Sequence, residues 1–151
     1  MAAIVSTVEI ECPAETAFAY VTDPSRFHEW QRDVVAGQIE GDPGQVGSRC
    51  ITTRRIGGRE RKATQELTAI DPPHHWSVHG VDGPVRVDVD VRVEALNGNT
   101  RSRVTFSLKF FGSGIGKVIV PLFVRPSAPR EVAQSCAALK ARLNEGAPPA
   151  T

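Results

Sequence analysis

The last third of the chain contains the only segment that is both long enough and periodic enough to form a long helix. Four apolar residues recur there at spacings of four, three and four: Val132, Cys136, Leu139 and Leu143. This spacing places them on one stripe of an α-helix that begins near Pro129, a residue suited to a first helical turn. Upstream, Pro121 interrupts the apolar run of residues 115–124, and a proline within a helix removes a backbone hydrogen bond. We therefore predict a short apolar helix, a break at residues 125–128, and then the long helix.

The rest of the chain is dominated by patterns typical of strands. In residues 85–94 five valines alternate with charged residues, which predicts a strand with one dry face and one wet face. Gly57 and Gly58 separate two further strand patterns and indicate a tight hairpin turn. Alternation and turn residues together predict strands at 4–10, 34–39, 48–56, 60–70, 75–81, 85–94 and 103–110.

These elements predict an α+β fold. Two short helices follow the first strand; the first holds Phe18 and the second carries Phe27 and Trp30. Sequential strands joined by short turns form an antiparallel sheet of six to seven strands, and the long C-terminal helix is the available cover for its apolar face. A chain of 151 residues suits one domain, which we place at residues 1–145, with a frayed tail at 146–151.

Composition argues against several classes of function. The net charge of +1 gives no footprint for nucleic acid, and no apolar run approaches the roughly 20 residues that span a bilayer, so we expect no stable membrane insertion. Three distant cysteines, Cys12, Cys50 and Cys136, show neither metal-ligand spacing nor a disulfide framework, which favours a cytoplasmic location. No glycine-rich phosphate loop is present, and we expect neither a cofactor nor a metal.

A segment near the N-terminus carries a resemblance to a known family. It begins Cys12-Pro13-Ala14-Glu15 and continues through Thr22-Asp23-Pro24 to Phe27, Glu29 and Trp30. The chain resembles the START-like (SRPBCC) superfamily, and within it the polyketide cyclase/dehydrase and lipid-transport family. The resemblance implies a helix-grip fold, in which a bent antiparallel sheet wraps around the C-terminal helix and leaves a deep cavity. Family members hold lipids, sterols, polyketides or other apolar molecules there, and some catalyse cyclisation or dehydration.

We therefore expect the protein to bind a small hydrophobic molecule, lipid or polyketide-like, as a monomer or homodimer. Given the resemblance, the residues expected to line the ligand cavity are the apolar ones on the inward faces of strands and helices. They are Phe27, Trp30, Trp76, Val87, Val89, Val91, Phe106, Leu108, Phe110, Ile119 and Leu122. The small residues on the long helix leave space opposite the sheet, and ligand sites are typically concave and apolar.

Two alternatives stay open. The protein could be a polyketide cyclase or dehydratase, and His79 is then the candidate acid–base residue, because an imidazole can move protons near neutral pH. An inward arginine or carboxylate, from Arg49, Arg54 or Glu66, could assist by pairing with a charged ligand group. Alternatively, the apolar residues 115–124 could meet a partner or a membrane surface, because they exceed what one buried stripe requires.

Overall fold

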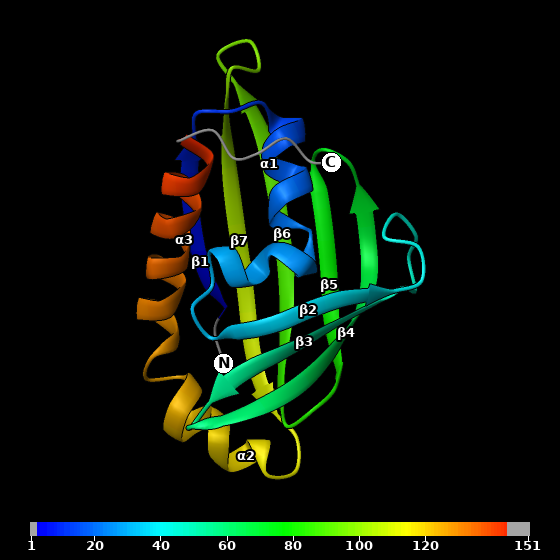
Figure 1. Ribbon diagram of the computed structural model, residues 1–151, viewed down its shortest axis with the longest axis vertical. Helices are drawn as coiled ribbons and strands as arrows, with labels where there is room; N and C mark the ends of the chain where they lie inside the picture. The colour runs from blue at the N-terminus through cyan, green and yellow to red at the C-terminus, as the bar shows by residue number, and fades with distance from the viewer. Residues whose placement is uncertain (1–2, 145–151) are drawn as a thin grey trace.

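The described part of the chain, residues 3–144 of the computed structural model, contains a seven-stranded antiparallel sheet (Figure 1). The strands are β1 (Ile4–Ile10), β2 (Val34–Glu40), β3 (Arg49–Ile56), β4 (Arg59–Asp71), β5 (His75–Asp82), β6 (Val85–Leu96) and β7 (Arg101–Gly112). Their order in the sheet is β1-β7-β6-β5-β4-β3-β2, a meander to which β1 is added beside β7. All seven predicted strands are present, and β4, β6 and β7 extend beyond the predicted ends.

Helices occur in two groups. Between β1 and β2 lie α1 (Ala14–Val21) and the 3₁₀-helix η1 (Pro24–Glu29). After β7 come α2 (Gly116–Ile119), the π-helical turn η2 (Val120–Val124) and the long α3 (Ala128–Asn144). The break between η2 and α3 lies at the predicted place, because Pro126 and Pro129 cannot supply the backbone donors of a continuous helix. None of the helices within residues 3–144 is long and apolar enough to cross a membrane.

The sheet is strongly bent around its helices. In Figure 1, β2 and β3 cross in front of β6 and β7, while α3 runs beside β1 along the left edge. The concave face is therefore flanked by α3 on one side and by η1 on another. This arrangement is the helix-grip fold, and the prediction of that fold is confirmed. The predicted tail, residues 146–151, lies outside the described residues.

The buried apolar residues form two clusters. The larger one packs beneath α1 and the second half of α3, where Ile10, Val104 and Leu139 are fully buried. The smaller one lies beneath α2 and η2 and includes Ile119 and Val120. The space between the sheet and the first half of α3 is bordered by members of both clusters, and it is there that the interior stays open.

Two glycines fix the end of the molecule at which α2 and η2 lie. A Cβ added at Gly116 would overlap the carbonyl oxygen of Pro84, so α2 rests directly on the turn between β5 and β6. Gly57 has a φ of 62°, as a tight β-hairpin turn requires. A Cβ at Gly57 would lie 3.6 Å from the Phe123 ring, so the tip of the β3–β4 hairpin touches η2.

Candidate ligand-binding site

A cavity of about 230 Å³ lies between the concave face of the sheet and the C-terminal helices. Its sheet wall consists of cross-strand pairs of β6 and β7, whose inward residues meet as Val87–Phe110, Val89–Leu108 and Val91–Phe106. Nine of the eleven residues predicted to line such a cavity do so: Phe27, Trp30, Trp76, Val87, Val89, Val91, Phe106, Leu108 and Phe110. The alternation along each strand explains this agreement, since it selects one face of the sheet.

Aromatic rings line one side of the cavity. Trp30 packs edge-on against Phe27 with ring centroids 5.9 Å apart, and it lies 5.7 Å from the ring of Phe106. The indole nitrogen of Trp30, Nε1, is buried and has no hydrogen-bond partner among the described residues. A buried donor without an acceptor costs about 1–3 kcal/mol.

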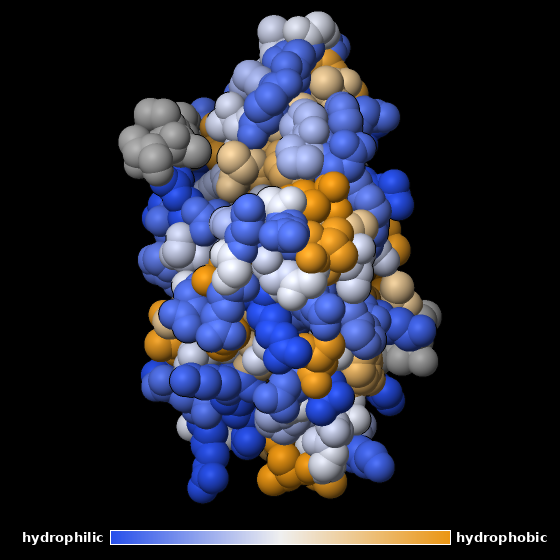
Figure 2. All heavy atoms as spheres, turned by 90° about the vertical axis from the view of Figure 1, so that its right-hand side faces the viewer, coloured by the Kyte–Doolittle hydropathy of each residue, from blue (hydrophilic) through white to orange (hydrophobic). Residues whose placement is uncertain are grey.

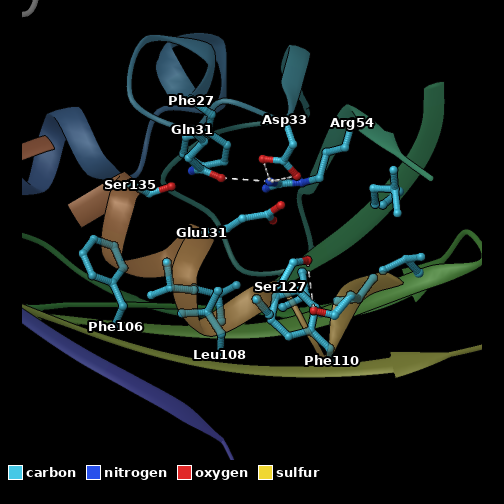
Figure 3. Close-up of a pocket in the computed structure, with 18 of the residues that line it drawn as sticks. Phe27, Gln31, Asp33, Arg54, Phe106, Leu108, Phe110, Ser127, Glu131 and Ser135 are labelled. Atoms are coloured by element: carbon cyan, nitrogen blue, oxygen red, sulfur yellow. Dashed lines mark hydrogen bonds and ion pairs between the residues drawn. The ribbon is translucent and has the colours of Figure 1, made fainter. Parts of the chain in front are cut away.

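Polar side chains gather on the side of the cavity that faces Leu108 and Phe110 (Figure 3). Arg54, on β3, donates from Nη1 to Oε1 of Gln31 at 2.9 Å and to the Asp33 carboxylate at 3.3 Å. Glu131 reaches toward the same group from α3. Partial burial, followed by the negative charge of Asp33, raises the pKa of the Glu131 carboxyl, and Arg54 opposes this effect. A carboxyl that titrates above its usual range beside an arginine can hold or release a proton close to a bound molecule.

The polar residues that α3 and the turn before it place at the cavity were missed by the sequence analysis. Ser127, Glu131 and Ser135 line the cavity at intervals of four residues, which places them in one row beside the apolar stripe. Gln65 was also missed; it is buried on β4, and its Nε2 donates to the carbonyl oxygen of Val87 at 2.9 Å. The four-residue spacing in α3 could have been noticed in the sequence, whereas nothing local distinguishes Gln65.

Two of the predicted lining residues do not face the cavity. Leu122 is exposed, and Ile119 is buried in the smaller cluster, below the cavity. The reason is the rotation of the helical segment, which turns Ile119, Val120 and Val124 toward the sheet and Leu122 away from it. The prediction that Ile119 and Leu122 line the cavity is therefore wrong.

His79, the candidate acid–base residue, does not line the cavity. Trp76 and Val78 occupy the inward positions of β5, so His79 lies on the outer face of the sheet. There its Nδ1 is 2.7 Å from the Asp88 carboxylate, and its ring stacks on Phe111. Of the three candidate charged residues, Arg54 lines the cavity and Arg49 and Glu66 do not.

All three cysteine thiols are buried. Burial raises the pKa of Cys50 to about 12 and also raises the pKa of Cys12 and Cys136. Cys136 lies on the apolar stripe of α3, where its Sγ is 3.4 Å from the Ser6 hydroxyl, and it lines the cavity. Thiols with such raised pKa values are poor nucleophiles, which supports the interpretation of Cys136 as a packing residue.

Known proteins share the sequence pattern and the fold that carry this geometry. The profile of the family described as polyketide cyclase/dehydrase and lipid transport matches residues 1–144. The chain belongs to this family. No curated protein matches its sequence.

Solved structures agree on the fold of this polyketide cyclase/dehydrase and lipid-transport family member. A START superfamily protein from Mycobacterium smegmatis is similar with a TM-score of 0.76 at 15% identity, over 96% of this chain and 99% of that one. TTHA0849 from Thermus thermophilus is similar with a TM-score of 0.75 at 13% sequence identity, over 97% of this chain and 99% of that one. The Zhui aromatase/cyclase from Streptomyces sp. R1128 is similar with a TM-score of 0.69 at 13% sequence identity, over 93% of this chain and 94% of that one. At these identities the similarity shows a shared fold, while the family match points to a hydrophobic ligand or a cyclase-type reaction.

Proposed function

We propose that the protein binds a small, mostly apolar molecule in the cavity between the sheet and α3. The observation that carries this proposal is the cavity itself, about 230 Å³ in volume and walled by aromatic and aliphatic side chains on most sides. A solid core would close such a space, because protein interiors are packed as densely as organic crystals. Walls of this kind, with a few convergent polar groups, are typical of small-molecule sites.

The volume limits the size of the guest. An apolar cavity of about 150 Å³ accommodates benzene, and sites for drug-sized ligands begin near 300 Å³. At about 230 Å³ this cavity suits one or two fused rings, or an acyl chain of similar volume. A polyketide of several fused rings would extend beyond this volume and out through the opening of the cavity.

The polar groups at the cavity define the chemistry of the guest. Arg54 offers a guanidinium beside the cavity, which suits a carboxylate, an enolate or a carbonyl oxygen. The proposed guest is therefore an apolar molecule with a carbonyl or an acidic group.

Intrinsic fluorescence tests this proposal directly, because both tryptophans of the chain, Trp30 and Trp76, line the cavity. We expect 2-acetylnaphthalene to change the tryptophan emission saturably and to bind about fivefold more tightly than 2-isopropylnaphthalene, which has the same shape but no acceptor. Absence of saturable binding for both compounds, and of any small molecule in native mass spectra of the purified protein, would contradict the proposal.

A second candidate function, a cyclase or dehydratase, is favoured by Glu131. Its carboxyl lines the cavity, has a raised pKa and lies near Arg54, which is an arrangement suited to proton transfer. If a poly-β-keto thioester is turned over, Glu131→Gln should lower kcat more than tenfold with little change in KM. His79→Ala, on the outer face, is the matched control and should leave both constants unchanged. Equal rates for the Glu131→Gln variant and the wild type would exclude this candidate.

A further inference from the structure

The α2–η2 segment carries exposed apolar residues along one side. Ile115, Val118 and Leu122 follow one another at helical spacings of three and four, Phe123 adjoins them, and each is more than half exposed. The opposite side of the same segment, with Ile119, is buried against the sheet. We name this exposed set, Ile115, Val118, Leu122 and Phe123, the apolar tip. Figure 2 shows apolar atoms at the lower end of the molecule, where Figure 1 places α2.

The apolar tip is the main concentration of exposed apolar side chains in the described residues. The other large apolar residues that are well exposed, Val5, Val35 and Val46, lie on three different segments. Scattered single residues of that kind are normal on protein surfaces, whereas a contiguous group marks an interaction site.

Positive charge surrounds the apolar tip. The β3–β4 hairpin, which touches Phe123 through Gly57, holds five basic residues and one acidic residue within positions 54–62. Residues 113–131 add Lys117, Arg125 and Arg130 and one acidic residue, Glu131. The two segments thus carry eight basic residues and two acidic residues, in a chain whose net charge is only +1. The rest of the chain is correspondingly acidic, so charge is strongly unequal between this end and the remainder.

The opening of the cavity lies at the same end. Several residues that line the cavity are also exposed, and they belong to the β3–β4 hairpin or to the η2–α3 segment: Arg55, Gly57, Lys62, Phe123 and Glu131. Phe123 belongs to both the apolar tip and the cavity wall. A surface that seats the apolar tip would therefore cover or adjoin the opening.

We propose that this end of the protein docks reversibly on an anionic membrane surface, with the apolar tip in the lipid interface and the basic residues against the head groups. Apolar side chains beside lysine and arginine, on a short helical segment, are typical of interfacial binding. Docking would let an apolar guest pass between bilayer and cavity without crossing water. The route of the guest rests on the proposed function, whereas docking can be tested without any guest.

A lipid surface fits the apolar tip better than a protein does. A stable protein interface takes about 20–30 residues on each side, and lysine is depleted there. Four apolar side chains are few by that standard, but they suffice for reversible membrane binding when each nearby basic residue adds attraction to anionic lipid. The excess of basic residues selects an anionic surface over a neutral one.

Vesicle sedimentation tests the proposal with the wild-type protein. We expect binding to vesicles of phosphatidylcholine and phosphatidylglycerol at 7:3, at least about tenfold tighter than binding to phosphatidylcholine alone, and weakened by 0.5 M NaCl. Equal or absent binding to the two compositions would overturn the proposal. Because this comparison needs no substitution, it is independent of variant folding.

Substitutions then assign the binding to the apolar tip. Val118→Ser/Leu122→Ser should lower the partition coefficient for the anionic vesicles about tenfold or more, and Lys117→Glu at least about fivefold. The matched controls are Val5→Ser/Val46→Ser, equally exposed but elsewhere, and Lys140→Glu on α3; both should stay within about twofold of the wild type. Equal loss in the controls would overturn the assignment.

Two further outcomes separate this proposal from others. If light scattering shows a dimer that Val118→Ser/Leu122→Ser abolishes, and anionic vesicles are not bound, the apolar tip contacts a second copy and the membrane proposal fails. If the same variant binds 2-acetylnaphthalene with wild-type affinity but no longer binds anionic vesicles, docking and guest binding are distinct and the proposal stands. Failure of guest binding with intact docking would remove the proposed function alone.

Discussion

The two halves of the C-terminal helix α3 differ in what they contact. In the second half, Leu139 and Leu143 are only 0% and 2% exposed. Oδ1 of Asn144 accepts a hydrogen bond from the Glu11 backbone N–H at 2.8 Å. In the first half, Glu131 and Ser135 face open space. One helix can therefore close the core at one end and leave a site at the other, because bulky leucines fill the space beside its second half and no such side chains fill the space beside its first half.

The largest effect should come from the packed half. Leu139→Ala removes a fully buried side chain from the main cluster, so we expect the free energy of unfolding to fall by about 2–5 kcal/mol in urea titrations. Val132→Ala is the matched control on the same helix, since Val132 borders existing space, and it should cost less than about 1.5 kcal/mol. Equal losses would show that the two halves are packed alike.

The open half should respond in binding rather than in stability. Val132→Phe adds a ring that points into existing space, so affinity for 2-acetylnaphthalene should fall about tenfold or more, which is about 1.4 kcal/mol. The melting temperature should hold or rise, because the added ring fills a void instead of overpacking a core. Calorimetric titration and thermal unfolding measure the two quantities. A large loss of stability with unchanged affinity would reverse the comparison.

Polar contacts at the open half should matter less. Arg54→Gln removes the donor that joins Gln31 and Asp33 at the side of the cavity, where both partners of the ion pair are about a quarter exposed. We expect unfolding free energy to fall by about 1 kcal/mol, since a partly exposed ion pair contributes less than a buried one. Binding of 2-naphthoate should weaken more than binding of 2-acetylnaphthalene. An equal loss for both guests would argue against a role for Arg54 in charge recognition.

The sequence pattern correctly predicted the strands of the sheet and most of the apolar residues that line the cavity. Alternation selects a face of each strand, and the resemblance to a family supplies the direction in which that face points. For this reason the sequence alone correctly predicts the inward residues that pair across β6 and β7, such as Val89 and Leu108. The break before α3 followed from its prolines for an equally local reason.

The sequence did not show which side of the segment 115–124, or which face of β5, contacts the interior. Leu122 was misplaced because residues 115–124 are apolar on both sides, so their spacing does not say which side packs against the sheet; the buried side is that of Ile119, Val120 and Val124. His79 was misplaced because β5 contains two interleaved sets of residues, and the set with Trp76 and Val78 faces inward. The polar side of the cavity joins β3, α3 and the loop after η1, and contacts between distant segments leave no local pattern.

The smallest effect concerns Glu131, and its sign is fixed by the direction of its pKa. Folding raises the pKa of this carboxyl, so the native state gains stability from protonation below the ordinary value of 4.5 and loses that gain as pH rises through the raised value. Glutamine is neutral at every pH. Glu131→Gln should therefore be slightly more stable than the wild type at pH 7, by less than about 0.5 kcal/mol, and the difference should vanish below about pH 4.5.

Glu15, at the start of α1, provides a control of opposite sign. Its carboxylate accepts a hydrogen bond from Nδ2 of Asn99 at 2.9 Å, and this bond lowers its pKa, so its contribution is present at neutral pH and is lost on acidification. Glu15→Gln should be less stable than the wild type at pH 7 and approach it as pH falls. Melting temperatures of both variants between pH 7 and pH 4 should therefore differ from the wild type in opposite directions. Shifts of the same sign would mean that Glu131 is not desolvated by the cavity, and the open half of the helix would then be wetter than its lining suggests.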